Sequence, residues 1–293
     1  MHTRISRDDK LFIAVSVTLV FIVVAATLYP FLYVFSSSIS DPLAVLQNKV
    51  WLWPVGFSLA AYQKLLLYPQ IGIGYMNTLF YTTVGTAVNI VLSAMMGYSL
   101  SRKTLVFRNF FIILVTFTLM FSGGLIPTFL IVKNLGLLDT RWALILPTAI
   151  SAWNLLLLKT FFENIPKELE EAAIIDGCTD MQVLYRIMVP LSMPALATIT
   201  LFYAVGHWNS YFNALIYLND PQRFPIQIFL RNIVIGSQTS GAVDTTGTSV
   251  DNSIMTESLK YTMIMIVSTP IIIVYPFIQR HFVSGIMVGS VKG

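Results

Sequence analysis

Long stretches without a single charged residue constrain this 293-residue chain more than any other feature of its sequence. A helix needs roughly 20 apolar residues to cross the hydrocarbon core of a bilayer. Six stretches without Asp, Glu, Lys or Arg reach or approach that length. We therefore predict an all-α, polytopic membrane protein with a single transmembrane domain at residues 1–293. The predicted spans cover approximately residues 11–36, 75–101, 109–132, 142–162, 190–217 and 261–280.

The composition of the chain indicates that most of its surface faces lipid. Hydrophobic residues make up 56% of the sequence and charged residues 11%, whereas a soluble domain carries roughly 25% charged residues. The net charge of +4 comes from basic residues scattered between the apolar stretches, which is typical of orientation signals. We expect membrane lipid and no nucleic acid among its partners. The single cysteine, Cys178, excludes an internal disulfide.

The distribution of Lys and Arg predicts that both termini are cytoplasmic, because basic residues accumulate in cytoplasmic loops. With the N-terminus inside, the predicted spans place eleven of the 18 basic residues in inner segments. Two outer segments are substantial, at residues 36–74 and 218–260. Trp51 and Trp53 in the first suit the membrane–water interface. We expect the second to be a mobile connecting loop or, alternatively, a docking surface for an extracytoplasmic partner.

The segment at residues 163–190, called the acidic segment below, differs from the rest of the chain. It holds six of the 14 acidic residues, namely Glu163, Glu168, Glu170, Glu171, Asp176 and Asp180. Pro166 fits the first position of a helix, and Gly177 is expected to end that helix in the left-handed conformation. Thr179, with Gln182 three residues later, predicts a capping box for a second helix. The acidic segment is therefore predicted to form a helix–turn–helix.

A fixed spacing of residues runs through the acidic segment. Glu171-Ala172-Ala173 is followed by Gly177 after three residues, by Ile187 after nine more and then by Pro190. This spacing resembles that of the permease subunits of bacterial ABC importers, whose cytoplasmic loop carries Glu-Ala-Ala, Gly and Ile-x-Leu-Pro. Val189 stands where leucine is usual. The resemblance implies a cytoplasmic coupling helix between spans four and five that lies in a groove of a separate ATPase subunit. It assigns ATPase coupling to Glu171, Ala172, Ala173, Asp176, Gly177, Ile187 and Pro190.

Further stretches resemble the permeases of maltose-type carbohydrate importers, in the branch that serves complex oligosaccharides. They lie at residues 122–128, 134–139, 208–217 and 279–293. The resemblance, which extends to the smaller permease subunit of alginate importers, implies an oligo- or polysaccharide substrate such as alginate or another polyuronate. It implies a bacterial inner-membrane complex with a second homologous permease, two ATPase subunits that hold ATP and Mg, and an extracytoplasmic solute-binding protein. The tail residues Lys292 and Gly293 are expected to reach toward the ATPase.

Two alternative functions are a permease for another small solute and a stand-alone secondary transporter. The chain has no Gly-x-x-x-x-Gly-Lys-Ser/Thr phosphate loop, so we expect ATP to be hydrolysed by another chain. The predicted spans contain no Asp or Glu, which argues against a proton or sodium relay. The histidines lack metal-ligand spacing, and no serine lies in Gly-x-Ser-x-Gly. We therefore expect no catalytic residue, metal or cofactor in this chain.

Polar residues within spans are candidates for a translocation path, because exposing them to lipid is costly. The predicted path residues are Trp153, Asn154, His207, Asn209, Tyr211 and Asn213. Hydrogen bonding between helices is the alternative role for these residues, and for Asn77 and Asn89 of the second span. Gly123 and Gly124 in the third span predict either close helix packing, which we favour, or a break in the helix beside a cavity.

Overall fold

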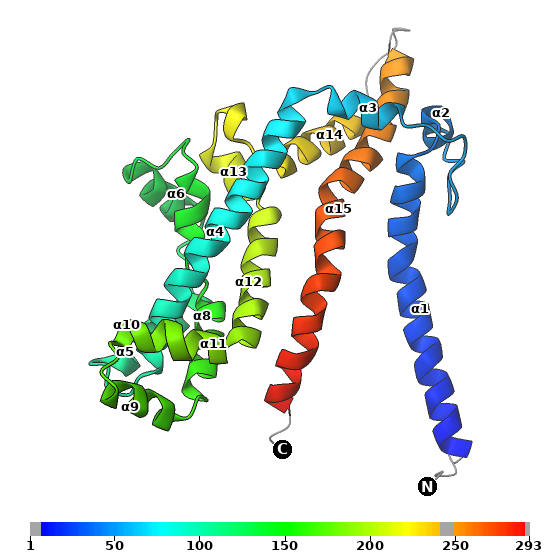
Figure 1. The fold of residues 1–293 in the computed structure, drawn as a ribbon. Helices are drawn as coiled ribbons and strands as arrows, with labels where there is room; N and C mark the ends of the chain where they lie inside the picture. Colours follow the sequence, from blue (N-terminus) through cyan, green and yellow to red (C-terminus); the bar gives the residue numbers. More distant parts are fainter. Residues whose placement is uncertain (1–6, 241–248, 291–293) are drawn as a thin grey trace. The chain divides into compact units, whose positions relative to one another are not determined.

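The computed structural model of the chain is built from helices (Figure 1), and it describes residues 7–240 and 249–290. Across these ranges it contains no extended strand, only an isolated bridge between Ser40 and Phe57. The predicted all-α class is therefore confirmed. Lys292 and Gly293, predicted to reach toward an ATPase, lie outside the described residues.

The chain divides into two compact units. The first consists of Met1–Tyr68 with Leu230–Thr269, and the second of Pro69–Phe229 with Pro270–Gly293. The single transmembrane domain expected from the sequence stays a prediction.

The first unit is held together near the C-terminal end of its long first helix, α1 (Arg7–Ser38). Tyr33 of α1 packs edge-on against Tyr261 of α15 (Ser249–Ser290), with ring centroids 5.5 Å apart. Thr262 of α15 donates a hydrogen bond to the carbonyl oxygen of Ser38 at 3.3 Å. Short helices α2 (Pro42–Leu46) and α3 (Ala60–Leu66) follow α1. The apolar side chains along α1, such as Phe12 and Phe21, are exposed, as a lipid-facing helix requires.

The second unit is organised around α4 (Pro69–Ser101), which packs along α12 (Met193–Trp208) and α8 (Ala152–Glu163) (Figure 1). Its other elements are α5 (Arg108–Met120), α6 (Leu125–Asn134), α7 (Trp142–Ile145), η1 (Leu146–Thr148), α9 (Lys167–Ile175), α10 (Asp180–Val183), the π-helix η2 (Leu184–Met188), α11 (Val189–Leu191), α13 (Phe212–Tyr217) and η3 (Pro221–Arg223). Three apolar clusters of described residues form its core. One joins α4, α8, α12 and the acidic segment, the second joins α4 with α7 and α13, and the third joins α4, α5 and α8.

Three helices are long and apolar enough to cross a membrane, at Asp8–Ser38, Pro69–Ser101 and Met255–Pro276. Three pairs of shorter helices meet the same criteria together but are bent. The bends are 118° between α5 and α6, 52° between α7–η1 and α8, and 88° between Asp180–Leu191 and α12. The described residues thus hold up to six crossings by length and composition. The predicted number of six spans is compatible with this but stays a prediction.

The start of α4 differs from the sequence expectation. The helix begins at Pro69 rather than near Tyr75. Gly72 and Gly74, which could interrupt a helix, lie within it. Proline is favoured at the first helical position. Gly74 has a packing role inside the helix, because a Cβ atom there would lie 2.8 Å from the ring of Phe229.

The two glycines of the third predicted span also differ from expectation. Apart from the chain neighbours, no described residue comes within 4 Å of the position that a Cβ atom would take at Gly123 or Gly124. The prediction of close packing is therefore wrong for the described part of the chain. The helix breaks here instead, with Gly124 at a φ of +83° before α6. Glycine adopts such a φ without steric cost, which allows the 118° bend.

The segment 218–260 contains regular structure that the sequence analysis missed. Helix α14 covers Ile226–Ser240 and α15 begins at Ser249, so the prediction of a connecting loop is wrong for most of these residues. Ile226, Phe229 and Ile233 recur at helical spacing. The Gly-, Ser- and Thr-rich run that follows concealed this period. Residues 241–248 of that run lie outside the described residues.

Candidate functional site

The acidic segment forms the helix–turn–helix that its sequence predicts. Helix α9 ends before Gly177, whose φ of +82° confirms the left-handed conformation. The N–H of Gly177 donates to the carbonyl of Ile174 at 3.0 Å and the N–H of Cys178 to that of Ala173 at 2.9 Å. This pair of bonds is the Schellman pattern that closes a helix.

The second helix of the acidic segment, α10, begins with the predicted capping box. The Thr179 side chain accepts from the N–H of Gln182, and the Gln182 side chain accepts from the N–H of Thr179. At the start of α9, Pro166 is the N-cap instead of the first helical residue, because its ψ of 129° is extended. Apart from this shift of one position, local sequence chemistry sets both helix boundaries.

Helix α9 has one face turned into the protein and one turned out. Ala173 is 6% exposed and belongs to the same apolar cluster as Val183 and Leu184. Its neighbour Ala172 is exposed, as is Glu171. Ile175 is 86% exposed, which is unusual for an isoleucine in a folded protein. The acidic segment therefore presents a surface that is partly apolar and partly acidic.

The remaining residues that the sequence resemblance assigns to coupling lie on both sides of this surface. Asp176 and Pro190 are exposed, and Ile187 is half-buried beside the apolar cluster. Within the described chain, no ion pair involves Glu168, Glu171 or Asp176. Their negative charges are therefore available to a basic partner surface.

The other acidic residues of this segment are paired with basic residues of the neighbouring helices. Glu163, at the end of α8, pairs with Arg108 of α5 and with Lys159 of α8 at 2.8 Å. Glu170 and Asp180 both pair with Arg102, which follows α4. Of the six acidic residues, three thus form ion pairs with described residues and three form none.

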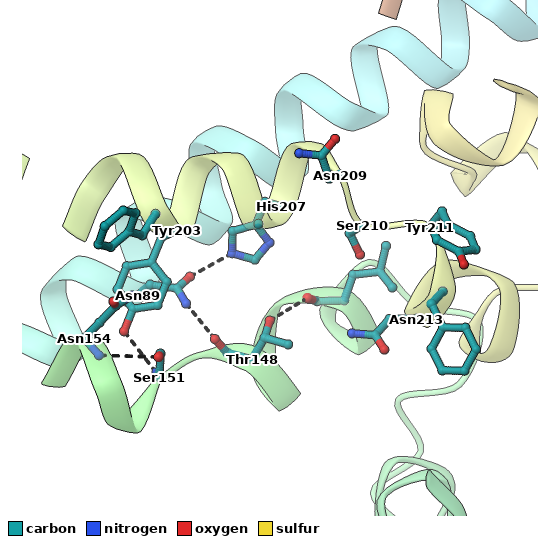
Figure 2. Close-up of a pocket in the computed structure, with 14 residues that line it drawn as sticks. Asn89, Thr148, Ser151, Asn154, Tyr203, His207, Asn209, Ser210, Tyr211 and Asn213 are labelled. Carbon is teal, nitrogen blue, oxygen red and sulfur yellow. Dashed lines mark hydrogen bonds between the residues drawn. The ribbon is translucent and has the colours of Figure 1, made fainter. Parts of the chain in front are cut away.

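A cavity of about 390 Å³ lies between α4, α8, α12 and α13, and polar side chains from all four helices line it (Figure 2). Of the predicted path residues, Asn154, His207, Asn209, Tyr211 and Asn213 line this cavity. Trp153 does not, and its side chain is 64% exposed on α8. Asn154 and Trp153 are adjacent in a helix, so they point in different directions.

Asn89 and His207 form the polar centre of the cavity wall (Figure 2). The Asn89 Nδ2 donates to the carbonyl oxygen of Thr148 at 2.6 Å, and its Oδ1 lies 2.9 Å from Nε2 of His207. Because an amide oxygen only accepts hydrogen bonds, Nε2 of His207 is the donor. Asn89 is 1% and His207 5% exposed. These bonds connect α4, η1 and α12, which is the alternative role that the sequence allowed.

Tyr203, one helical turn before His207, forms a second set of hydrogen bonds in the cavity wall. Its hydroxyl accepts from the N–H of Ser151 at 3.0 Å and lies 2.8 Å from Oγ of Ser93. The Ser151 side chain in turn accepts from the N–H of Asn154, which caps α8. The N-terminus of α8 is therefore positioned by a side chain of α12.

The opposite wall of the cavity lies at the break between α12 and α13. The helix ends at Trp208 and resumes at Phe212, leaving Asn209, Ser210 and Tyr211 between them. Asn209 donates to the carbonyl of Val205 at 3.0 Å and accepts from Gln227 at 3.2 Å. Tyr211 is 44% exposed. The break thus brings amide, hydroxyl and aromatic groups together at one end of the cavity.

A network around Asp139 joins the two elements that flank this end of the cavity. Its N–H donates to the carbonyl of Tyr217 at 2.8 Å. Its carboxylate accepts from the N–H groups of Asn219 and Asp220, each at 3.0 Å, and pairs with Arg223 at 3.3 Å. Asp139 precedes α7 and Tyr217 ends α13, so this residue fixes the loops before α7 and after α13 to each other.

The Asp139 contacts predict a pH dependence of stability. The N–H groups of Asp220 and Asn219, with Arg223, hold the pKa of the Asp139 carboxyl below its ordinary value of 3.8. The folded protein thus favours the charged form, and this contribution is present above pH 3.8 and lost as the pH falls through the lowered pKa. We expect Asp139→Asn to lower the melting temperature at neutral pH and by less in acid. A difference that stays constant across this pH range would contradict the assignment.

Comparison with known proteins assigns this chain to a family. The sequence profile of the family described as "Binding-protein-dependent transport system inner membrane component" matches residues 89–288. The chain belongs to this family. The matched range includes the acidic segment and every polar residue that lines the cavity. The chain is therefore a permease subunit of an ABC importer and an inner-membrane component of it.

Individual relatives of this permease cover nearly all of its length. It is 48% identical over 265 residues to the polygalacturonan/rhamnogalacturonan transport system permease protein YtcP of Bacillus subtilis, covering 90% of this chain and 92% of the relative. It is 44% identical over 270 residues to the protein LplC of the same organism, covering 92% and 90%. A crystal structure of a bacterial ABC transporter involved in the import of the acidic polysaccharide alginate matches with a TM-score of 0.87 and 34% identity, covering 96% and 99%.

Sequence reasoning missed three residues of the permease that take part in the hydrogen bonds around the cavity. Tyr203 lies four residues before His207, and this helical spacing on one face was the available signal. Thr148 and Ser151 lie in the bend between α7 and α8, where a continuous span was expected. Their roles depend on that bend, which local sequence does not specify.

Proposed function

We propose that this permease imports oligosaccharides rich in uronic acids, as one half of a heterodimer with a second homologous permease. Two ATPase subunits on the cytoplasmic side and an extracytoplasmic solute-binding protein complete the proposed complex. ATP and Mg are held by the ATPase subunits. In this arrangement both termini and the acidic segment are cytoplasmic, in agreement with the bias of Lys and Arg in the sequence.

The observation that carries the proposed coupling to an ATPase is the outward face of the acidic segment. Ile175 is 86% exposed, and Glu168, Glu171 and Asp176 carry unpaired charges beside it. An exposed apolar side chain rimmed by charge is typical of a protein-protein contact. The segment is too polar to face lipid, so its partner is a soluble surface. We assign that surface to a groove of the ATPase.

The cavity supports a saccharide substrate. It offers amide, hydroxyl and aromatic groups and no side chain of Asp, Glu, Lys or Arg among its lining residues. Sugar rings present hydroxyl edges and an apolar face, which amides and aromatic rings bind respectively. The relatives named for polygalacturonan/rhamnogalacturonan and for alginate support acidic saccharides as the class. A cavity without carboxylates does not repel such a substrate.

The proposed mechanism is alternating access. Closure of the ATPase dimer displaces the acidic segment, and the helices that line the cavity move so that it opens outward to the solute-binding protein. This permease supplies one wall of the path and the second permease supplies the other. A stand-alone secondary transporter remains disfavoured, because the predicted spans lack Asp and Glu. Import of another small solute is the second candidate, which the substrate experiment below distinguishes.

The two adjacent alanines of α9 provide a test of the docking surface. Ala172→Leu adds volume to the exposed face, so we expect it to abolish copurification of the ATPase with little change in melting temperature. Ala173→Leu adds the same volume to a buried site, and overpacking there costs about 1–3 kcal/mol of stability. If Ala172→Leu leaves both ATPase binding and uptake intact, this face is not the docking surface.

Reconstitution tests the substrate class. We expect proteoliposomes with both permeases, the ATPases and the binding protein to take up labelled oligogalacturonides at the expense of ATP. Neutral oligosaccharides of the same length should be transported more slowly. Omission of this chain should abolish uptake, and the chain alone should hydrolyse no ATP. Hydrolysis by the isolated chain would overturn the proposed division of labour, whereas uptake of only a neutral solute would overturn the substrate class.

A further inference from the structure

Arg102, the residue that follows α4, contacts both helices of the acidic segment. Its guanidinium forms an ion pair with Glu170 of α9 and another, at 2.9 Å, with Asp180 of α10. It also lies over the ring of Tyr98, 4.6 Å from the centroid. One side chain thus joins three elements that are separate in the sequence.

Two of the three side chains in these ion pairs are largely protected from solvent. The Arg102 side chain is 17% exposed and that of Glu170 is 22% exposed, whereas Asp180 is 77% exposed. Charged hydrogen bonds screened from water are stronger and more directional than exposed ones. The pair with Glu170 is therefore the principal contact, and the pair with Asp180 orients the guanidinium.

No other described ion pair joins α9 or α10 to another helix of the second unit. The remaining pairs at this end of the molecule join Glu163, before α9, to Arg108 and Lys159. Apolar packing also holds α9 and α10 against α4, but apolar contacts are non-directional and permit small sliding movements. Arg102 supplies the directional contact that such packing lacks.

Helix α4 continues without a break from this ion-pair site to the cavity. It covers Pro69–Ser101, with Asn89 in its interior and bound to His207 and Thr148. An unbroken helix with its backbone hydrogen bonds intact transmits displacement along its axis. The acidic segment is also continuous with α12, but the 88° bend lies between them.

We propose that Arg102 is a positioning residue that fixes α4 to both helices of the acidic segment, so that displacement of this segment moves the α4 wall of the cavity. The inference rests on the proposed coupling of the acidic segment to an ATPase. It adds that coupling passes through α4 by way of one guanidinium, in addition to the direct chain connection to α12. Loss of Arg102 then leaves ATP hydrolysis running while the cavity responds less, because only the connection to α12 remains.

The test measures the accessibility of the cavity in the full complex. Cys178→Ser removes the only cysteine, and Asn213→Cys places a thiol in the cavity wall. The labelling rate with a water-soluble maleimide is measured in the nucleotide-free complex and after trapping with ATP and vanadate. We expect the two rates to differ by about fivefold or more in this background, a change typical of coupled sites.

In Arg102→Ala we expect the difference between the two rates to become clearly smaller, while ATP hydrolysis by the complex persists. Arg102→Lys keeps the charge and should restore part of the difference. Lys103→Ala is the matched control. It also removes one positive charge, at the next residue along the chain, but the Lys103 side chain is exposed. It should behave like the background.

The outcomes separate the inference from the function on which it rests. If the background itself shows no nucleotide-dependent change, the proposed coupling to an ATPase fails. If the background and Arg102→Ala both retain the full change, coupling stands and the role of Arg102 is wrong. If Lys103→Ala loses the change as well, the effect reflects net charge at this end of α4 and the specific ion pairs are not responsible.

Discussion

Replacing Gly177 with proline is expected to abolish uptake while the protein remains in the membrane. Gly177 has a φ of +82°, which proline cannot adopt because its ring fixes φ near −65°. The substitution also removes the N–H that donates to the carbonyl of Ile174. The angle between α9 and α10 must then change, so the outward face no longer fits its groove. Uptake by proteoliposomes and the amount of protein in the membrane fraction are the two measurements.

Gly136 provides a matched control for this prediction. Its φ is +67°, its N–H donates to the carbonyl three residues before it, and no described residue beyond its chain neighbours lies within 4 Å of a Cβ atom placed there. Gly177 likewise has a positive φ, an N–H that donates to the carbonyl three residues before it, and open space at the Cβ position. Alanine at either position costs about 1–2 kcal/mol in the left-handed conformation. Gly177→Ala should impair uptake more than Gly136→Ala at equal loss of stability. Equal impairment would show that strain alone explains the effect.

Gly85→Ala is expected to disrupt the cavity and greatly reduce transport. A Cβ atom at this position would lie 2.6 Å from Cε1 and Nε2 of the His207 ring, so the ring must move. Its hydrogen bond with Asn89, at 2.9 Å, would then be lost. Overpacking of this kind costs about 1–3 kcal/mol, and the broken bond leaves buried polar atoms unpaired. Melting temperature and uptake should both fall.

The cause of this effect can be isolated with two further variants. Gly97→Ala, on the same helix, places a Cβ atom at an ordinary distance of 3.6 Å from Leu158 and should be tolerated. Gly85→Ala combined with His207→Ala removes the steric conflict and should recover part of the stability lost in the single variant. If the double variant is less stable than either single variant, the conflict between residue 85 and His207 is not the cause.

Much of the acidic segment could be predicted from its sequence, because each boundary depends on local chemistry. Gly177 adopts the conformation that only glycine adopts freely, and Thr179 and Gln182 satisfy each other's backbone groups. The assignment of helices and of the membrane class followed from the same kind of signal. These features depend on residues within one or two helical turns, so no tertiary information was needed.

The bends and the cavity could not be predicted, because they depend on contacts between distant residues. Asn89 and His207 looked like two separate polar residues in two spans, and only the packing of α4 on α12 brings them within 2.9 Å. Gly85 had no visible role until the ring of His207 was placed against it. Trp153 does not line the cavity for a related reason, since residue type alone does not say which face of α8 turns inward; its place in the path stays a prediction.

The π-helix η2 at Leu184–Met188 fixes the length of the chain between α10 and α12. A π turn accommodates an additional residue within an otherwise α-helical path. Deleting one residue there would convert it to regular α geometry, but a second deletion could not be absorbed and would rotate everything that follows by about 100°. Because α12 departs at 88°, that rotation would swing the whole helix through an arc, carrying Tyr203 and His207 out of register with α4. The chain between α10 and α12 can therefore lose the one residue that the π turn absorbs, and no more, without displacing α12.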